Sequence, residues 1–123
     1  MPHKHPTVLL VDDNDDVRDG LTQLIRAEGY AVETARNGRE ALRVLATVHP
    51  CIILLDLHMP DMSGYDFRQA QLADGVLRDI PVVVYSAAHD VREQSQRMTA
   101  TAYAEKPIEI ARLMQLIRTH CLK

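Results

Sequence analysis

The chain has 123 residues, enough for one compact domain with its own core and too few for two. With 46% apolar and 25% charged residues, its composition is that of an ordinary globular protein. The net charge of −3 and the scattered basic residues argue against a nucleic-acid-binding surface, and no stretch is long and apolar enough to span a bilayer. The first apolar run is too short for a signal-peptide core. We therefore expect a cytoplasmic protein that contacts neither nucleic acid nor membrane.

The first half of the chain predicts two strands, each followed by a helix. Val8–Val11 is an uninterrupted apolar run, typical of a strand that is covered on both faces. Apolar residues then recur at helical spacing from Val17 to Ile25, after an Asp/Asn cluster that can cap a helix and before Gly29, which can end it. Ala31–Ala35 alternates in polarity and predicts a strand nearer an edge. A second helical pattern follows Asn37-Gly38.

The second half repeats the pattern three times. Ile52–Leu55 and Val82–Tyr85 predict buried strands, and Thr101–Ala104 is a weaker candidate. Helical patterns follow them, with a break expected at Asp74-Gly75 in the first and a closing helix after Pro107. Strand and helix alternating five times predict an α/β fold, a doubly wound five-stranded parallel sheet. We choose the flavodoxin-like (βα)5 arrangement with strand order 2-1-3-4-5, as a single domain over residues 7–121 after a flexible N-terminus, residues 1–6.

Polar residues gather where the predicted strands end. Asp12 and Asp13 follow the first strand, Asp56 the third, Ser86 the fourth and Lys106 the fifth. Each has an ordinary explanation alone, as a helix cap, a turn residue or a surface lysine. In a parallel sheet, however, the carboxyl ends of the strands share one edge, where ligands bind. The coincidence of all five predicts a binding site there.

This combination of side chains favours phosphoryl chemistry. Three carboxylates packed together need a compensating cation, and a hard divalent ion such as Mg²⁺ prefers oxygen ligands. One carboxylate could then act as the nucleophile and form an aspartyl phosphate. Lys106 and Ser86 would contact the oxygens of the incoming phosphoryl group.

The chain resembles the receiver domains of two-component response regulators over nearly its whole length. The resemblance is carried by the following motifs in this order: Val11-Asp12-Asp13-Asn14, Asp56-Leu57-His58-Met59-Pro60 with Gly64, Ser86-Ala87, Tyr103, and Lys106-Pro107. It implies that Asp56 is the phosphoacceptor and that Asp13 binds Mg²⁺, or alternatively Mn²⁺, directly. Asp12 would bind the ion partly through water, and the backbone carbonyl of His58 would be a further metal ligand.

The resemblance also implies a switch. The Ser86 hydroxyl would move toward the phosphoryl group, the Tyr103 ring would turn inward, and Lys106 would bind the phosphoryl group. The Lys106–Pro107 bond resembles one that is cis in the family. The donor would be a phosphohistidine on a sensor histidine kinase or a histidine phosphotransfer protein.

The output surface would comprise the fourth helix, fifth strand and fifth helix, where a downstream protein, or a second copy after phosphorylation, would bind. We expect no output domain within these 123 residues. We expect self-phosphorylation and autodephosphorylation rather than turnover of a substrate, so the chain is not expected to be an enzyme in the usual sense.

Three alternatives remain. A haloacid-dehalogenase-type phosphatase also uses a nucleophilic aspartate, but it needs a second aspartate where His58 stands, and a cap domain. A degenerate receiver would act only as a protein-interaction module, against which the five pocket residues argue. A zinc site is a weak option, because His3 and His5 lie in the expected flexible terminus and the other four histidines share no ligand spacing.

Several positions depart from the family pattern. Thr99-Ala100 stands where members often have Gly-Ala, so the turn before the fifth strand lacks its glycine. The fourth helix carries only Val91 and Met98 as apolar residues, which predicts that it is short or mobile without a phosphoryl group. Cys51 is expected to be a small buried hydrophobe, and Cys121 a partly exposed thiol.

Overall fold

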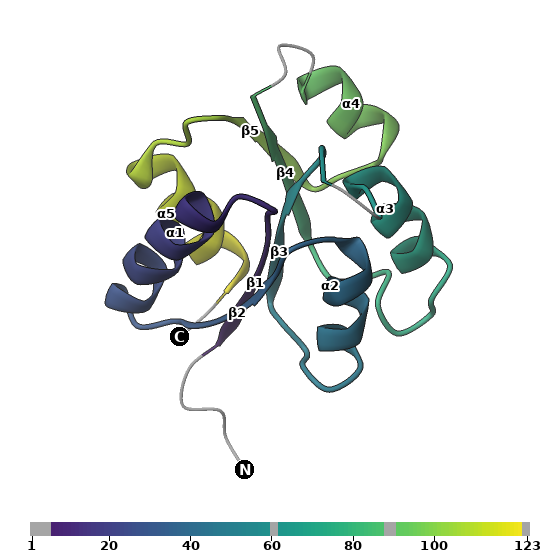
Figure 1. Cartoon of the computed structure of the whole chain (residues 1–123), viewed down its shortest axis with the longest axis horizontal. Coiled ribbons are helices and arrows are strands. Elements are labelled where there is room, and N and C mark those ends of the chain that lie inside the picture. The colour runs from purple at the N-terminus through teal and green to yellow at the C-terminus, as the bar shows by residue number, and fades with distance from the viewer. Residues whose placement is uncertain (1–5, 60–61, 88–90, 122–123) are drawn as a thin grey trace.

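The computed structural model describes residues 6–59, 62–87 and 91–121, which leaves nearly all of the expected flexible N-terminus outside the described residues. Within these ranges, strands and helices alternate five times along the chain (Figure 1). The strands are β1 Thr7–Val11, β2 Ala31–Ala35, β3 Ile52–Asp56, β4 Val82–Ser86 and β5 Ala102–Glu105. The helices are α1 Asp15–Ala27, α2 Gly38–Leu45, α3 Gly64–Leu72, α4 Val91–Arg97 and α5 Ile110–His120.

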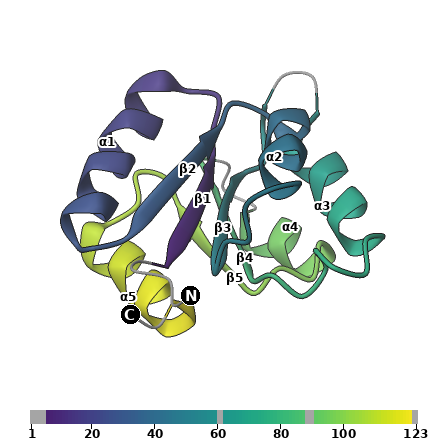
Figure 2. The same cartoon turned by 90° about the horizontal axis from the view of Figure 1, so that it is seen from below.

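The strands form one parallel sheet with the order β2-β1-β3-β4-β5, which confirms the predicted topology. Helices α1 and α5 cover one face of the sheet, and α2, α3 and α4 cover the other, as both views show (Figures 1 and 2). The doubly wound arrangement is therefore confirmed. None of the helices in the described part of the chain has both the length and the apolar character needed to cross a membrane.

The central strands are buried on both faces, as their uninterrupted apolar runs predict. Leu10 and Leu54, which are register partners across β1 and β3, pack toward α1 and α5, while Leu9 and its partner Ile53 pack toward the other three helices. Burying each such side chain contributes about 1.5–3 kcal/mol. The ends of these strands are therefore fixed by packing, and the polar residues that follow them are held in place.

Side-chain caps confirm the helix starts predicted near Asn14 and at Asn37, and Ser63, which was not predicted, caps α3 in the same way. The side chains of Asn14, Asn37 and Ser63 each accept a backbone N–H of the helix that follows. At the other end of α1, Gly29 takes a φ of 94°, a conformation that glycine adopts without a steric penalty. Helix α3 ends at Leu72, just before the break that was predicted at Asp74-Gly75.

The expectations of a partly exposed Cys121 thiol and of Cys51 as a small buried hydrophobe are both wrong, and Cys51 is only half-buried. Cys51 and Cys121 form a disulfide, with their Cα atoms 5.4 Å apart, and Cys121 is only 2% exposed. The bond joins the residue before β3 to the residue after α5. The bond thus places the C-terminal end of α5 at the edge of the sheet where β3 begins.

Among the described residues, helix α4 spans Val91–Arg97, directly after residues 88–90, which the structure does not describe, so the prediction of a short or mobile helix stays a prediction. Val91, Ser95 and the following Met98 are its buried contacts. Thr99, in the turn that follows, has a φ of 51°. The backbone thus keeps a glycine-like conformation although the residue is a threonine.

Candidate functional site

The polar residues expected at the carboxyl edge of the sheet lie there. Asp12 and Asp13 follow β1, Asp56 is the last residue of β3, Ser86 is the last residue of β4, and Lys106 follows β5. Oxygen atoms from Asp12, Asp13 and Asp56 all lie within 4.8 Å of one another. Asp12 and Asp56 are buried, whereas Asp13 is exposed and forms the solvent side of the cluster.

Lys106 bridges the two buried carboxylates. Its Nζ lies 3.1 Å from Oδ2 of Asp12 and 3.3 Å from Oδ2 of Asp56. Its backbone N–H donates to the carbonyl oxygen of Ser86 at 2.9 Å, and its peptide bond to Pro107 is cis. Lys106 therefore joins the ends of β1, β3 and β4 through charge and hydrogen bonding.

The ionisation of this cluster reflects competition between burial and pairing. Burial raises the pKa of Asp56, the neighbouring Lys106 ammonium opposes that change, and the Asp12 carboxylate adds to it, so the pKa stays above its usual value. Burial lowers the pKa of Lys106, but its hydrogen bond to Asp12 and the charges of Asp56 and Asp12 outweigh burial and leave the pKa raised. The cluster thus brings three carboxyl groups together with the single ammonium of Lys106.

The loop after β3 closes against Asp56. The His58 N–H approaches Oδ1 of Asp56 at 3.4 Å, a long hydrogen bond, while the His58 side chain is exposed. Gly64 lies directly against the backbone of Asp56 and Leu57, and its N–H donates to the Leu57 carbonyl. Pro60, the last residue of the expected motif, lies outside the described residues.

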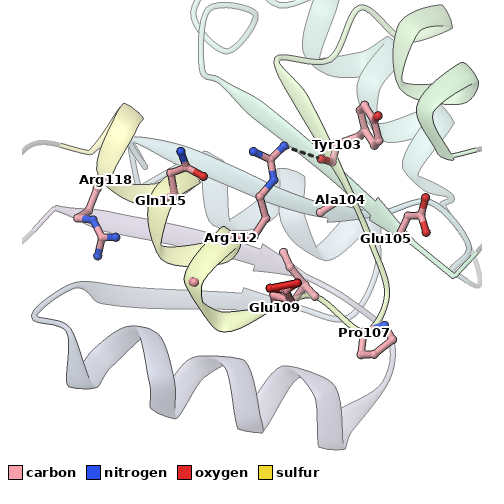
Figure 3. Close-up of a pocket in the computed structure, with 10 residues that line it drawn as sticks. Tyr103, Ala104, Glu105, Pro107, Glu109, Arg112, Gln115 and Arg118 are labelled. Carbon is pink, nitrogen blue, oxygen red and sulfur yellow. Dashed lines mark hydrogen bonds between the residues drawn. The ribbon is translucent and has the colours of Figure 1, made fainter.

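Ser86 and Tyr103 occupy two neighbouring strands. Ser86 is 1% exposed, and the half-buried Tyr103 lies opposite Val84 in the register of β4 and β5. The Tyr103 side chain packs against the core on the α2, α3 and α4 side, and its carbonyl accepts a hydrogen bond from Arg112 at 3.2 Å. In Figure 3 the Tyr103 ring and Arg112 lie on opposite sides of the strand.

An open groove of about 930 Å³ runs along β5 and α5, on the expected output surface. Tyr103 and Glu105 line it from the strand, and Arg112 and Arg118 line it from the helix (Figure 3). The groove therefore presents both carboxylate and guanidinium groups to a partner. It is separate from the acidic cluster, none of whose carboxylates lines it.

Tyr85 is a site residue that the sequence analysis missed. Its hydroxyl donates to Oδ2 of Asp12 at 2.6 Å, and its ring centroid lies 5.0 Å from Nζ of Lys106. The apolar run predicted only a buried strand residue at this position. The available signal was the hydroxyl itself, because a buried tyrosine usually finds a hydrogen-bond partner.

The acidic cluster fits a hard divalent cation better than zinc. Its donors are carboxylate oxygens, which suit Mg²⁺ or Mn²⁺, while zinc sites mostly use cysteine and histidine. Among the residues that the structure describes, no histidine joins a group of three or more potential ligands. The weak zinc alternative thus gains no support from His49, His58 or His120.

Comparison with known proteins adds to this geometry. Residues 8–118 match the family model of the response regulator receiver domain. The chain is 34% identical over 113 residues to the response regulator MprA of Mycolicibacterium vanbaalenii, covering 90% of this chain and 48% of that protein. It is 32% identical over 116 residues to the polar-differentiation response regulator DivK of Brucella ovis, covering 93% of this chain and 94% of that protein. The chain thus spans about half of MprA and nearly all of DivK.

Solved structures agree with these matches. The signal receiver domain of a signal transduction histidine kinase from Syntrophus aciditrophicus superposes with a TM-score of 0.85 at 30% identity, covering 93% of this chain and 88% of that chain. The response regulator TrrA from Thermotoga maritima, in complex with Mg²⁺-BeF, gives 0.82 at 25% identity, covering 93% and 97%.

Proposed function

Because this chain belongs to the response regulator receiver family, we propose that it is a phosphorylation-controlled switch of a two-component phosphorelay, with Asp56 as its phosphoacceptor. The observation that carries the proposal is the bridge that Lys106 makes between Asp12 and Asp56, at 3.1 and 3.3 Å. This bridge places the Lys106 ammonium beside the buried Asp56 carboxylate. The ammonium can then stabilise the negative charge of an incoming phosphoryl group.

The proposed metal ligands are Asp12, Asp13, Asp56 and the backbone carbonyl of His58, with Mg²⁺ as the ion and Mn²⁺ as an alternative. The raised pKa of Asp56 supports this assignment, because burial and the Asp12 charge leave that carboxylate in need of a compensating cation. A divalent ion would supply charge neutralisation for the three carboxylates and the phosphoryl oxygens. The Mg²⁺-BeF complex of the Thermotoga relative is consistent with such a site.

In the proposed reaction, an oxygen of Asp56 attacks the phosphorus of a phosphohistidine. The P–N bond breaks, and its electron pair returns to the imidazole nitrogen, which takes up a proton. Lys106 then transfers its contact from the two carboxylates to a phosphoryl oxygen. The hydroxyl of Ser86, at the end of the adjacent strand, donates a hydrogen bond to another phosphoryl oxygen. Self-phosphorylation and autodephosphorylation are the only reactions proposed for the chain.

The proposed output runs from Ser86 to Tyr103. Movement of Ser86 toward the phosphoryl group frees space, and the half-buried Tyr103 ring turns inward. The change would reach the groove of Figure 3 through the backbone of β5, because the Tyr103 carbonyl, on the side of the strand away from the ring, accepts the hydrogen bond from Arg112. A downstream protein, or a second copy of the chain, would read the surface of α4, β5 and α5.

The upstream partner in this proposal is a sensor histidine kinase or a histidine phosphotransfer protein, and the place of action is the cytoplasm. Likeness to DivK and to a kinase-borne receiver domain supports a phosphorelay role without naming the pathway.

Intact mass measurement after incubation with Mg²⁺ and a small phosphodonor tests the proposal. We expect one phosphoryl adduct on the parent, none on Asp56→Asn, and none in excess EDTA. An equal adduct on Asp56→Asn would move the phosphoacceptor elsewhere. Absence of the adduct and of Mg²⁺ binding in the parent would favour the degenerate receiver, and steady release of phosphate from an ester would favour the phosphatase.

A further inference from the structure

Tyr85 occupies an unusual place between the core and the acidic cluster. It lies in β4, beside Asp56 in the register of β3 and beside Ala104 in that of β5. Its ring is 2% exposed and packs among Leu21 and Leu113, on the α1 and α5 side of the sheet. Phenylalanine would fill the same space, so packing alone does not explain the hydroxyl.

The hydroxyl and the ring contact two charged groups of the pocket. The hydroxyl donates to Oδ2 of Asp12 at 2.6 Å, a short hydrogen bond of the kind made to a charged acceptor. The other oxygen of Asp12, Oδ1, accepts the Asn14 N–H at 2.8 Å. The Lys106 ammonium shares Oδ2 and lies over the Tyr85 ring. Asp12 is therefore held at both oxygens, and Tyr85 is the side-chain donor that comes from the core.

We infer that Tyr85 is a positioning residue that fixes the Asp12 carboxylate for metal binding. The inference rests on the proposed function and deepens it. Asp12 is 0% exposed, so solvent cannot replace a lost donor easily. When Lys106 moves to the phosphoryl group, the Tyr85 hydroxyl remains hydrogen-bonded to Oδ2 of Asp12. This bond holds the carboxylate in its orientation. Loss of such a partner behind a metal ligand typically weakens metal affinity 10–100-fold.

The test is the Mg²⁺ dissociation constant of Tyr85→Phe, measured by calorimetry without a phosphodonor. We expect binding about tenfold weaker than in the parent. Tyr30→Phe is the matched control, because Tyr30 is buried in the same core but precedes β2, at the opposite edge of the sheet. Its Mg²⁺ affinity should equal that of the parent. Unchanged or tighter binding by Tyr85→Phe would overturn the inference.

A spectroscopic readout separates positioning from general support of the fold. The chain has four tyrosines and no tryptophan, so its near-ultraviolet absorption reports mainly on tyrosine. Mg²⁺ should produce a tyrosine difference spectrum in the parent and in Tyr30→Phe, and most of it should vanish in Tyr85→Phe. A full-sized difference spectrum in Tyr85→Phe contradicts the inference, and so does a loss of thermal stability with no loss of Mg²⁺ affinity.

The two proposals fail differently. At Mg²⁺ concentrations far above its weakened dissociation constant, Tyr85→Phe should still accept a phosphoryl group on Asp56. If the parent neither binds Mg²⁺ nor gains the adduct, both the proposed function and this inference fall. If the parent does both and Tyr85→Phe binds Mg²⁺ equally well, only the role of Tyr85 falls.

Discussion

Gly64 lies so close to Asp56 that a Cβ atom added to it would stand 2.5 Å from the Asp56 carbonyl oxygen. The same atom would stand 2.9 Å from the Cα of Leu57. Both neighbours are backbone atoms, which cannot rotate away as a side chain can. The start of α3 is thus pressed against the proposed phosphoacceptor, and only a residue without a side chain fits there.

We predict that Gly64→Ala destabilises the protein by about 1–3 kcal/mol, the usual cost of forcing an extra group into a packed site. The displaced Asp56 backbone should also slow formation of the phosphoryl adduct. Chemical denaturation and the mass assay measure the two effects. Gly20→Ala is the control, because nothing lies within 4 Å of the added Cβ atom. Gly20 lies inside α1, so replacing it with alanine should raise the free energy of unfolding by about 0.5–1 kcal/mol. Equal effects of the two substitutions would contradict the prediction.

The sequence predicted the sheet and the acidic cluster for the same physical reason. Buried parallel strands are uninterrupted apolar runs, and the residue that ends each run, such as Asp56 or Ser86, is placed by the strand before it. Once the strands were assigned, the common edge followed. Local capping signals at Asn14 and Gly29 were equally readable, because they depend on neighbours within a few residues.

Contacts between distant side chains could not be predicted in this way. The hydrogen bond from Tyr85 to Asp12 spans 73 positions, and the disulfide between Cys51 and Cys121 spans 70. Each requires the final placement of two elements to within about an ångström, which periodicity does not provide. Arg68 is a third case. Its guanidinium is buried against the carbonyls of residues 30 and 31 positions away, although an arginine in a helix is usually expected at the surface.

The raised pKa of Asp56 makes stability depend on pH. The folded protein holds the Asp56 proton more tightly than the unfolded chain, whose ordinary pKa is 3.8. The favourable contribution is therefore complete below that value and is lost as pH rises through the raised pKa. In EDTA at pH 7, the free energy of unfolding of Asp56→Asn should exceed that of the parent by about 1 kcal/mol, a typical single-substitution effect.

The difference in free energy of unfolding between Asp56→Asn and the parent should become smaller as the pH falls from 7 to 4. Urea denaturation at each pH measures it. Lys106 keeps Asp12 as a partner in the variant, so its ammonium is not left alone. Saturating Mg²⁺ should stabilise the parent more than the variant, because the ion neutralises the Asp56 charge. A variant that is less stable than the parent in EDTA at every pH contradicts this account.

Thr99 stores strain in the turn before β5. A β-branched residue with a φ of 51° is rare, because its side chain crowds the backbone in the left-handed region. Thr99→Gly should therefore raise the free energy of unfolding by about 1 kcal/mol, net of the hydrogen bond from the Thr99 hydroxyl to the Met98 carbonyl. Thr101→Gly should instead destabilise, because the Thr101 Oγ1 accepts the Val82 N–H. The denaturant midpoints of the two variants test this prediction. Loss of stability in both variants would contradict the claim that the Thr99 backbone is strained.

Helix α4 should exchange its amide hydrogens faster than α5 in the absence of a phosphoryl group. Over its described residues α4 buries only Val91 and Ser95, whereas α5 buries Leu113, Met114, Leu116 and Ile117. The C-terminal end of α4 depends on Arg68, whose Nε and Nη2 donate to the carbonyls of Met98 and Thr99 at 3.0 and 2.8 Å. Arg68→Met should speed exchange in α4 further, because it removes both of these hydrogen bonds and leaves the Met98 carbonyl with the Thr99 hydroxyl alone as a side-chain donor. Equal protection of α4 and α5 in the parent would contradict the prediction.

The disulfide between Cys51 and Cys121 should contribute strongly to stability. It closes a loop of about 70 residues, for which the chain-entropy model allows about 4 kcal/mol, and 2–4 kcal/mol is typical. Reduction should therefore lower the melting temperature by about 10 °C. Cys121→Ser should melt like the reduced parent and show no response to the reductant. Alkylation followed by mass measurement checks the bond itself, since the unreduced, denatured parent should take up no label.

The same experiment bears on the expected cytoplasmic location. Disulfides persist mainly in oxidising compartments, and reducing cytosol would hold most such pairs as thiols. The end of α5 would then lose its covalent tie to β3, while Leu113 and Ile117 would still pack against the sheet. We expect the reduced protein to remain folded and to bind Mg²⁺ as the oxidised one does, because the bond lies at the edge opposite Asp56. A tenfold change in Mg²⁺ affinity on reduction would instead show that α5 couples the two edges of the sheet.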